Sequence, residues 1–201
     1  DISIIEMIRA YTMFPNYGIN TKPIYITRIE DRNGNLLENF VPERKEVINE
    51  VTAYKMIRMM EGTVLFGTGK RLKPAYGIKG ECAGKTGTTN SEADAWFIGY
   101  TNQIATGVWV GFDKERTIGV GEVGGKAALP IWLEYMKFAQ TNLPEETFTA
   151  PPGVKIVELD AESGRLANAT SARKISQAFI EGTEPNSTTT RTEEAADFLK
   201  Q

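Results

Sequence analysis

Residues 82–90 read Cys-Ala-Gly-Lys-Thr-Gly-Thr-Thr-Asn, and two segments rich in aromatic and β-branched residues follow at 95–100 and 104–112. The residues between these two segments, 101–103, have the length of a hairpin loop. We therefore predict three consecutive antiparallel strands, with Lys85-Thr86-Gly87 on the first. A lysine, a hydroxyl residue and a glycine in a row on a strand suggest the wall of an active site, supported by the rest of the chain.

The composition is that of an ordinary globular protein. With 201 residues the chain can bury one core, or one core and a small appendage. Its net charge is −3, and charged residues of both signs are dispersed along the chain. The sequence therefore shows no basic face for nucleic acid or an anionic membrane. No apolar run approaches the roughly 20 residues that a membrane span needs, and no signal peptide is recognisable. Because the chain opens on Asp1 instead of Met, we expect a processed or excised piece.

Two absences exclude whole classes of chemistry. There is no histidine, so a Ser-His-Asp or Cys-His apparatus cannot form within this chain, and the commonest transition-metal ligand is missing. Cys82 is the single cysteine, which excludes an internal disulfide and a cysteine-rich zinc site. Any proton carrier here must be Lys, Asp, Glu or Tyr.

The segment before the central strands contains a helix and a hairpin. Ser3 followed by Glu6 three residues later is a capping-box pattern, and it predicts a helix that ends before residues 15–18. Apolar runs at 24–30 and 36–40 enclose an Asn-Gly turn, which is the strongest short hairpin signal.

Two further helices are predicted. Asn49 can cap a helix over 50–65 with one apolar stripe, after which 67–69 begin a loop through Lys70, Arg71 and Pro74. A second helix carries Pro130 in its first turn. Its predicted buried residues are Leu129, Trp132, Leu133 and Met136.

Residues 80–86 offer a rival interpretation, because Gly-Glu-Cys-Ala-Gly-Lys-Thr resembles the phosphate-binding loop G-x-x-x-x-G-K-[ST]. Three residues separate the glycines here, where that motif needs four. A phosphate-binding loop also leaves a buried strand and enters a helix, whereas Thr88 to Ser91 lead into a strand-like run. Nucleotide binding therefore stays as a minor alternative.

The string 83–90, followed by Asp-Ala-Trp-Phe-Ile-Gly-Tyr-Thr at 94–101, resembles the penicillin-binding protein transpeptidases, most of all the bifunctional class A enzymes of bacterial cell-wall synthesis. Residues 67–69 match the family's Gly-Thr-Gly loop, and 130–132 match its closing helix. K-T-G is one of three motifs that these enzymes share with serine β-lactamases, beside S-x-x-K and S-x-N. The resemblance implies an α+β fold, an antiparallel sheet flanked by helices, and it implies no metal or organic cofactor.

The chemistry explains these residue types. An extended peptide can lie along an edge strand, and Gly87 leaves room for its backbone. The resemblance implies that the Thr88 N–H is half of an oxyanion hole, and losing one such donor typically costs about 2.7–4 kcal/mol of barrier. The hydroxyls of Thr86 and Thr88 would bind the substrate's terminal carboxylate. Lys85 would supply positive potential and keep a neighbouring lysine or serine in the right protonation state.

The residues that follow have other candidate roles. We assign Thr89 and Asn90 to substrate binding as well, although a turn residue such as Asn90 can equally cap the local turn. Asp94 is expected to order the loop into the next strand and to take no part in catalysis. The tryptophans are expected to belong to the core: Trp96, Trp109 and Trp132.

The nucleophile is the missing element. In this family the order is S-x-x-K, S-x-N and then K-T-G, and nothing before Lys85 fits either earlier motif. Ser171 to Lys174 fit the bare pattern S-x-x-K, but they follow K-T-G and no S-x-N comes after them. We treat this match as a chance occurrence, and expect an upstream part of the same domain to supply the serine and its lysine.

We therefore predict that residues 1–142 are the C-terminal part of a transpeptidase domain and that 143–201 are a linker with a small appendage, frayed from residue 187. The parent enzyme would cross-link peptidoglycan stem peptides through an acyl-serine, at the outer face of the cytoplasmic membrane, and would bind β-lactams. This chain alone is expected to be inactive, with any membrane anchor and glycosyltransferase domain outside it. A non-catalytic β-lactam or peptidoglycan sensor on the same scaffold is the alternative.

Overall fold

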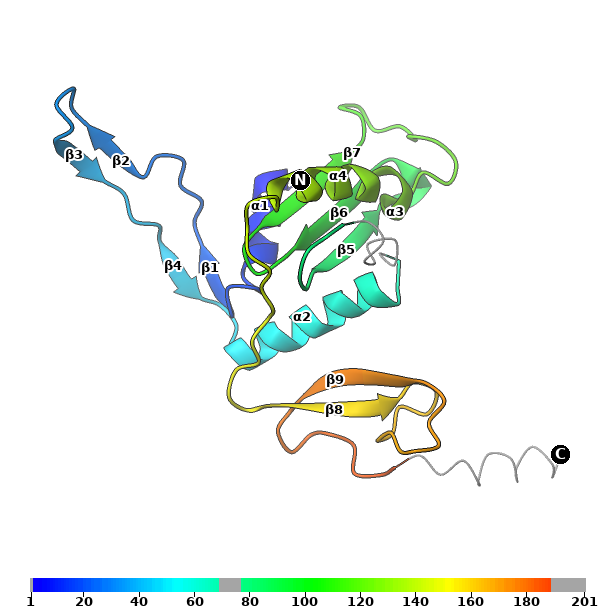
Figure 1. The fold of residues 1–201 in the computed structure, drawn as a ribbon. Helices are drawn as coiled ribbons and strands as arrows, with labels where there is room; N and C mark the ends of the chain where they lie inside the picture. Colours follow the sequence, from blue (N-terminus) through cyan, green and yellow to red (C-terminus); the bar gives the residue numbers. More distant parts are fainter. Residues whose placement is uncertain (1, 69–76, 189–201) are drawn as a thin grey trace. The chain divides into compact units, whose positions relative to one another are not determined.

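Strand β5 (Ala83–Thr88) forms one edge of a three-stranded antiparallel sheet whose order is β5-β6-β7. In the computed structural model, which describes residues 2–68 and 77–188, Lys85 lies opposite Ile98 of β6 (Ala95–Tyr100), and Ile98 lies opposite Gly107 of β7 (Ala105–Val110). The predicted meander and the predicted α+β class are confirmed (Figure 1).

The chain divides into two compact units, residues 1–149 and 150–201. The predicted boundary at 142/143 therefore precedes the end of the first unit by seven residues (149 − 142). The predicted loop through Lys70, Arg71 and Pro74 lies outside the described residues, as do residues 189–201 of the end predicted to fray from residue 187. That prediction is wrong for its first two residues, because the Ser187 carbonyl accepts from the N–H of Leu166 and Thr188 forms a β-bridge with Leu166.

Helices cover both faces of the sheet (Figure 1). Helix α1 (Ile4–Thr12) packs on the face that contains Gly107, because a Cβ there would come within 2.8 Å of Ile8. Helices α3 (Gly124–Ala127) and α4 (Leu129–Ala139) pack on the opposite face, and α2 (Glu50–Leu65) packs along β5. The predicted caps are present: Ser3 and Glu6 form a capping box, and the Asn49 side chain accepts from the N–H of Thr52.

The core of the first unit is centred on Trp132, which is fully buried. Its indole N–H lies 3.0 Å from the carbonyl oxygen of Thr106 and 3.3 Å from that of Gly99, and its ring meets Phe97 edge-on at 5.2 Å. All four residues predicted for the buried face of α4 are buried. Trp109 corrects the prediction for the tryptophans, because it is 38% exposed and is held by a polar contact described below.

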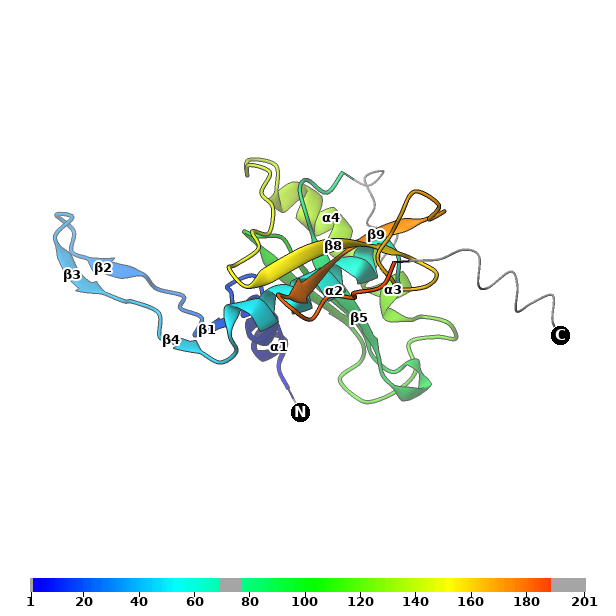
Figure 2. The same cartoon turned by 90° about the horizontal axis from the view of Figure 1, so that it is seen from below.

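The segment between α1 and α2 forms two short antiparallel ladders (Figures 1 and 2). Strand β1 (Ile19–Thr21) pairs with β4 (Arg44–Glu46), and β2 (Arg28–Glu30) pairs with β3 (Leu36–Asn39). The predicted Asn-Gly hairpin is confirmed between β2 and β3, while β1 and β4 carried no sequence signal that we recognised.

The second unit contains an antiparallel pair, β8 (Val154–Asp160) and β9 (Lys174–Ile180). Strand β8 was predicted within one residue at its end, whereas β9 was missed. Its first four residues, Lys174 to Gln177, include one apolar side chain, whereas three of the first four residues of β8 are apolar. Among the described residues no helix is long and apolar enough to cross a membrane.

Candidate active site

The side chain of Lys85 lies on the face of the sheet that α1 covers. Strand alternation places it beside Ile98, and its ammonium group donates to the carbonyl oxygen of Thr86 at 2.7 Å. It is exposed and lines a cavity of about 340 Å³. The other lining residues come from α1 with its C-terminal end and from α2: Ala10, Tyr11, Met13, Phe14, Met56 and Met60.

Thr86 and Thr88 point to the opposite face, and both hydroxyls have partners. The hydroxyl oxygen of Thr86 lies 2.9 Å from that of Thr68, just beyond the end of α2. The hydroxyl oxygen of Thr88 accepts from the N–H of Gly124 at 3.1 Å, at the start of α3. Both threonines line a cleft of about 520 Å³ together with Lys126. Two lysines, Lys85 and Lys126, thus flank the strand on its two faces.

Gly124 allows the backbone of α3 to approach the strand. A Cβ on Gly124 would come within 2.5 Å of the Gly87 carbonyl oxygen and 2.3 Å of the Trp96 carbonyl oxygen. A Cβ on Gly87 would come within 3.2 Å of the Trp96 side chain. That Cβ would lie on the face that contains Lys85, away from α3, so the packing of α3 does not itself require a glycine at position 87. The glycine-rich stretch before α4 was the signal that could have identified Gly124 and Lys126.

The turn after the strand is closed by Thr89 and Asp94. The Thr89 hydroxyl donates to the Asp94 carboxylate at 3.0 Å and accepts from the Asp94 N–H at 2.8 Å. The other Asp94 oxygen accepts from the indole N–H of Trp109 at 2.8 Å. The predicted role of Asp94 in ordering this loop is confirmed. Asn90 is exposed and starts a short 3₁₀ turn, η3 (Asn90–Glu92).

Other potentially reactive groups have structural partners. Burial raises the pKa of the Cys82 thiol to about 12, so that it stays protonated at neutral pH and is not an activated nucleophile. In the second unit, the Ser171 hydroxyl accepts from the N–H of Asn168 at 3.1 Å and is hydrogen bonded to Asp160, while Lys174 lies 3.9 Å from Glu158. Among residues 2–68 and 77–188 no cluster of three His, Cys, Asp or Glu side chains could hold a metal ion.

A family model described as the penicillin binding protein transpeptidase domain matches residues 1–136, with the Lys-Thr-Gly strand inside the matched region. The chain belongs to this family. Penicillin-binding protein 1A of Aquifex aeolicus is 38% identical over 188 residues, which cover 94% of this chain and 25% of that protein. Penicillin-binding protein 2D of Bacillus subtilis is 37% identical over 188 residues, covering 90% of this chain and 26% of that protein. The chain therefore spans about a quarter of the length of these relatives.

Solved structures agree with this transpeptidase assignment. The crystal structure of penicillin-binding protein 1A from Haemophilus influenzae matches with a TM-score of 0.82 at 30% identity, covering 94% of this chain and 33% of that chain. Penicillin-binding protein A from M. tuberculosis, solved as an imipenem acyl-enzyme complex, matches with a TM-score of 0.53 at 18% identity and covers 68% of this chain and 31% of that chain. The latter likeness concerns the fold alone.

The position of Lys85 and Thr86 also bears on the nucleotide alternative. A phosphate-binding loop wraps its backbone N–H groups around phosphates at the start of a helix. Lys85 and Thr86 instead lie inside β5, paired residue by residue with β6.

Proposed function

We propose that this chain is the C-terminal part of a D,D-transpeptidase domain and that β5 is one wall of its acyl-transfer site. The observation that supports this most directly is Lys85-Thr86-Gly87-Thr88 on the edge strand of the sheet, with both threonine hydroxyls held from neighbouring elements. An edge strand offers backbone groups to an extended peptide, which binds by adding a strand. Peptidoglycan stem peptides are the proposed substrates.

In this proposal the Thr88 N–H donates to the oxygen of the carbonyl under attack, where negative charge develops in the transition state. The hydroxyls of Thr86 and Thr88 bind the substrate's terminal carboxylate, with Gly87, Thr89 and Asn90 beside them. Thr88 already accepts one hydrogen bond from Gly124, which leaves its own proton free to donate. Lys85 supplies positive charge on the sheet face that α1 covers, where its side chain lines the cavity of about 340 Å³.

The nucleophile is proposed to be a serine of a part of the protein outside these 201 residues. Its hydroxyl oxygen would bond to the carbonyl carbon of the substrate's terminal peptide bond. The C–N bond would break, and the proton lost by the serine would pass to the amine that leaves with the terminal residue. An amine of a second stem peptide would then displace the serine and complete the cross-link. The absence of S-x-x-K before Lys85, and the structural partners of Ser171, support this division. Without that serine, the chain alone is expected to be inactive.

β-Lactams are proposed as inhibitors that acylate the same serine, in line with the imipenem acyl-enzyme of the M. tuberculosis structure. The proposed location is the outer face of the cytoplasmic membrane, reached through an anchor outside this chain. No cofactor is required, since proton transfer and oxyanion stabilisation suffice for acyl transfer.

Labelling with fluorescent penicillin tests the proposal. In the full-length protein, Lys85→Ala should lower the acylation rate by at least about tenfold, because it removes the cation on the K-T-G strand. The matched control Lys114→Ala removes an exposed lysine beyond β7 and should leave the rate unchanged. Equal rates for the two variants would contradict a catalytic role of Lys85. Labelling without turnover of stem peptides would favour the alternative, a sensor on the same scaffold.

A further inference from the structure

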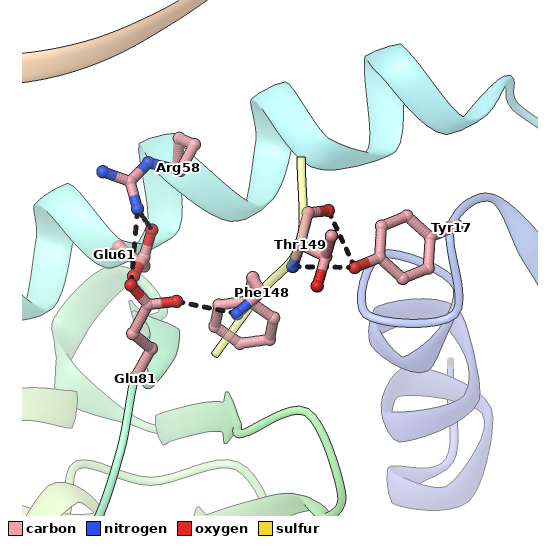
Figure 3. Close-up of polar contacts among 6 residues, drawn as sticks. All are labelled: Tyr17, Arg58, Glu61, Glu81, Phe148 and Thr149. Atoms are coloured by element: carbon pink, nitrogen blue, oxygen red, sulfur yellow. Dashed lines mark hydrogen bonds and ion pairs between the residues drawn. The ribbon is translucent and has the colours of Figure 1, made fainter. Parts of the chain in front are cut away.

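We propose that Glu81 is a positioning residue for the K-T-G strand, linking it to α2 and to the segment 146–149 that ends the first unit. This inference rests on the proposed function of β5. Glu81 lies two residues before β5, and its two carboxylate oxygens face different elements (Figure 3). One accepts from the N–H of Phe148 at 2.7 Å, and the other lies 3.9 Å from the guanidinium of Arg58 on α2.

Arg58 bridges two carboxylates (Figure 3). It lies 2.7 Å from Glu61, one turn further along α2, and the side chains of Arg58 and Glu61 are 18% and 6% exposed. A buried charge needs a partner, and here one guanidinium serves both carboxylates at the point where α2 meets the start of β5. Thr68, just beyond the end of α2, is hydrogen bonded to Thr86 in the middle of the strand. The strand is therefore held near its start from α2 and in its middle from the residues that follow α2.

The segment 146–149 is held along its length. The Glu146 carbonyl accepts from the Glu81 N–H, and its carboxylate accepts from the side chains of Asn102 and Gln103. Next to Glu81, Gly80 has a φ of +70°, and a Cβ there would come within 2.8 Å of the Glu146 carbonyl oxygen. This close approach explains a glycine at that position.

Two tyrosines outside the segment, Tyr100 and Tyr17, fix the rest of it. The Phe148 ring is 5% exposed and meets the Tyr100 ring edge-on at 5.9 Å, and Tyr100 lies opposite Ala83, the first residue of β5. The hydroxyl of Tyr17 accepts from the Thr149 N–H at 3.0 Å and donates to its carbonyl oxygen at 2.9 Å (Figure 3). Tyr100 and Tyr17 thus keep the backbone N–H of Phe148 in place to donate to Glu81.

The consequence concerns the position of the strand. Glu81 receives a hydrogen bond from the segment and an ion pair from α2, so that the start of β5 is fixed from two sides. A displacement of about 1 Å at a reacting group can cost about 100-fold in rate even when its cause lies far from the chemistry. Loss of Glu81 is therefore expected to slow acylation without removing any group that contacts the substrate.

The test uses the full-length protein with Glu81→Ala, Glu81→Gln and Glu81→Asp, and Glu134→Gln as control. Glu134 is a surface residue, 72% exposed, paired with Lys137. Time courses with fluorescent penicillin over a concentration series separate the non-covalent Kd from the first-order acylation constant. We expect Glu81→Ala to lower that constant about 10- to 100-fold with a smaller change in Kd. Glu81→Asp should retain most of the wild-type acylation constant, and the constant of Glu134→Gln should equal that of the wild type.

Hydrogen exchange separates positioning from general destabilisation. In Glu81→Ala the amides of 83–88 should exchange faster while those of 105–110 stay as in the control. Wild-type acylation by Glu81→Ala, or equal acceleration in both strands, would overturn the proposal, and Glu81→Gln decides by the same criteria if the alanine variant does not fold. If the wild type forms no penicillin adduct, the proposed function fails, and the exchange comparison alone decides the role of Glu81.

Discussion

The hydroxyl oxygens of Thr68 and Thr86 lie 2.9 Å apart, so that the residue just beyond α2 is hydrogen bonded to the central residue of Lys85-Thr86-Gly87. This contact orients a hydroxyl that we propose to bind the substrate's carboxylate. It also joins the Gly-Thr-Gly stretch to the Lys-Thr-Gly stretch, two motifs that the sequence presents separately.

Thr68→Val should weaken the binding of substrate and penicillin without unfolding the protein. A single hydrogen bond contributes about 0.5–1.5 kcal/mol, which corresponds to a loss of affinity of about 2- to 12-fold. Thr52→Val, an exposed position in the first turn of the same helix, is the matched control. Titration with fluorescent penicillin gives both affinities, and an unchanged Kd for Thr68→Val would exclude this orienting role.

Gly124→Ala should destabilise the first unit and slow acylation, because its Cβ would come within 2.3 Å of the Trp96 carbonyl oxygen and 2.5 Å of that of Gly87. Overpacking of this kind typically costs about 1–3 kcal/mol. Gly62→Ala is the control, since nothing lies within 4 Å of that Cβ and alanine favours a helix interior. Urea unfolding compares the two variants, and equal stability would show that the α3 backbone can move away from β5.

Asp94→Ala should loosen the turn that follows the K-T-G strand. The substitution leaves the Thr89 hydroxyl and the Trp109 indole N–H without their carboxylate partner. Hydrogen bonds to a charged group contribute about 1.5–3 kcal/mol, so a loss of unfolding free energy in that range is expected. Asp113→Ala, at an exposed position beyond β7, serves as the reference in the same urea titration. A loss no larger than that of Asp113→Ala would contradict the bonding seen here.

Glu61 should make stability fall with rising pH. Burial raises its pKa from 4.5 to about 7 in the folded protein, against the opposing effect of Arg58. Between these values the folded state binds more protons than the unfolded state, so this contribution to stability is complete below pH 4.5 and is lost as the pH rises to about 7. The loss is at most about 3–4 kcal/mol, at about 1.4 kcal/mol per unit of pKa shift.

Glu61→Gln cannot titrate, so the stability of this variant relative to the wild type should increase across that pH range. Urea unfolding of both proteins at a series of pH values measures the difference. Parallel curves would mean that Glu61 ionises in the folded protein as it does in the unfolded chain.

Local patterns were sufficient to predict most of the elements. The Ser3 and Asn49 caps, the Asn-Gly hairpin and the strand alternation around Lys85 are local signals, and the structure confirms the elements that they predict. The apolar spacing in α4 likewise identified its buried residues.

The contacts that hold the strand were not predictable in the same way. Thr68–Thr86, Gly124–Thr88 and Glu81–Phe148 join residues 18, 36 and 67 positions apart, and no periodicity records such pairs. Glu61 was missed because a glutamate inside an apolar stripe is ordinarily assigned to the solvent face. Its burial is compensated by its neighbour Arg58, which lies 2.7 Å away, and by a raised pKa that favours the neutral carboxyl. Strand β1 has three residues, and pairs with β4 far along the chain, which explains why neither was predicted.

Intact-protein mass after incubation with benzylpenicillin tests the central claim most directly. It is measured on residues 1–201 alone and on the full-length protein, with peptide mapping of any adduct. The account predicts one drug-sized adduct on the full-length protein, on a serine outside these residues, and none on the short chain. An adduct on the short chain, with Ser171 the first serine to examine, would contradict it, as would a full-length protein that takes up no penicillin.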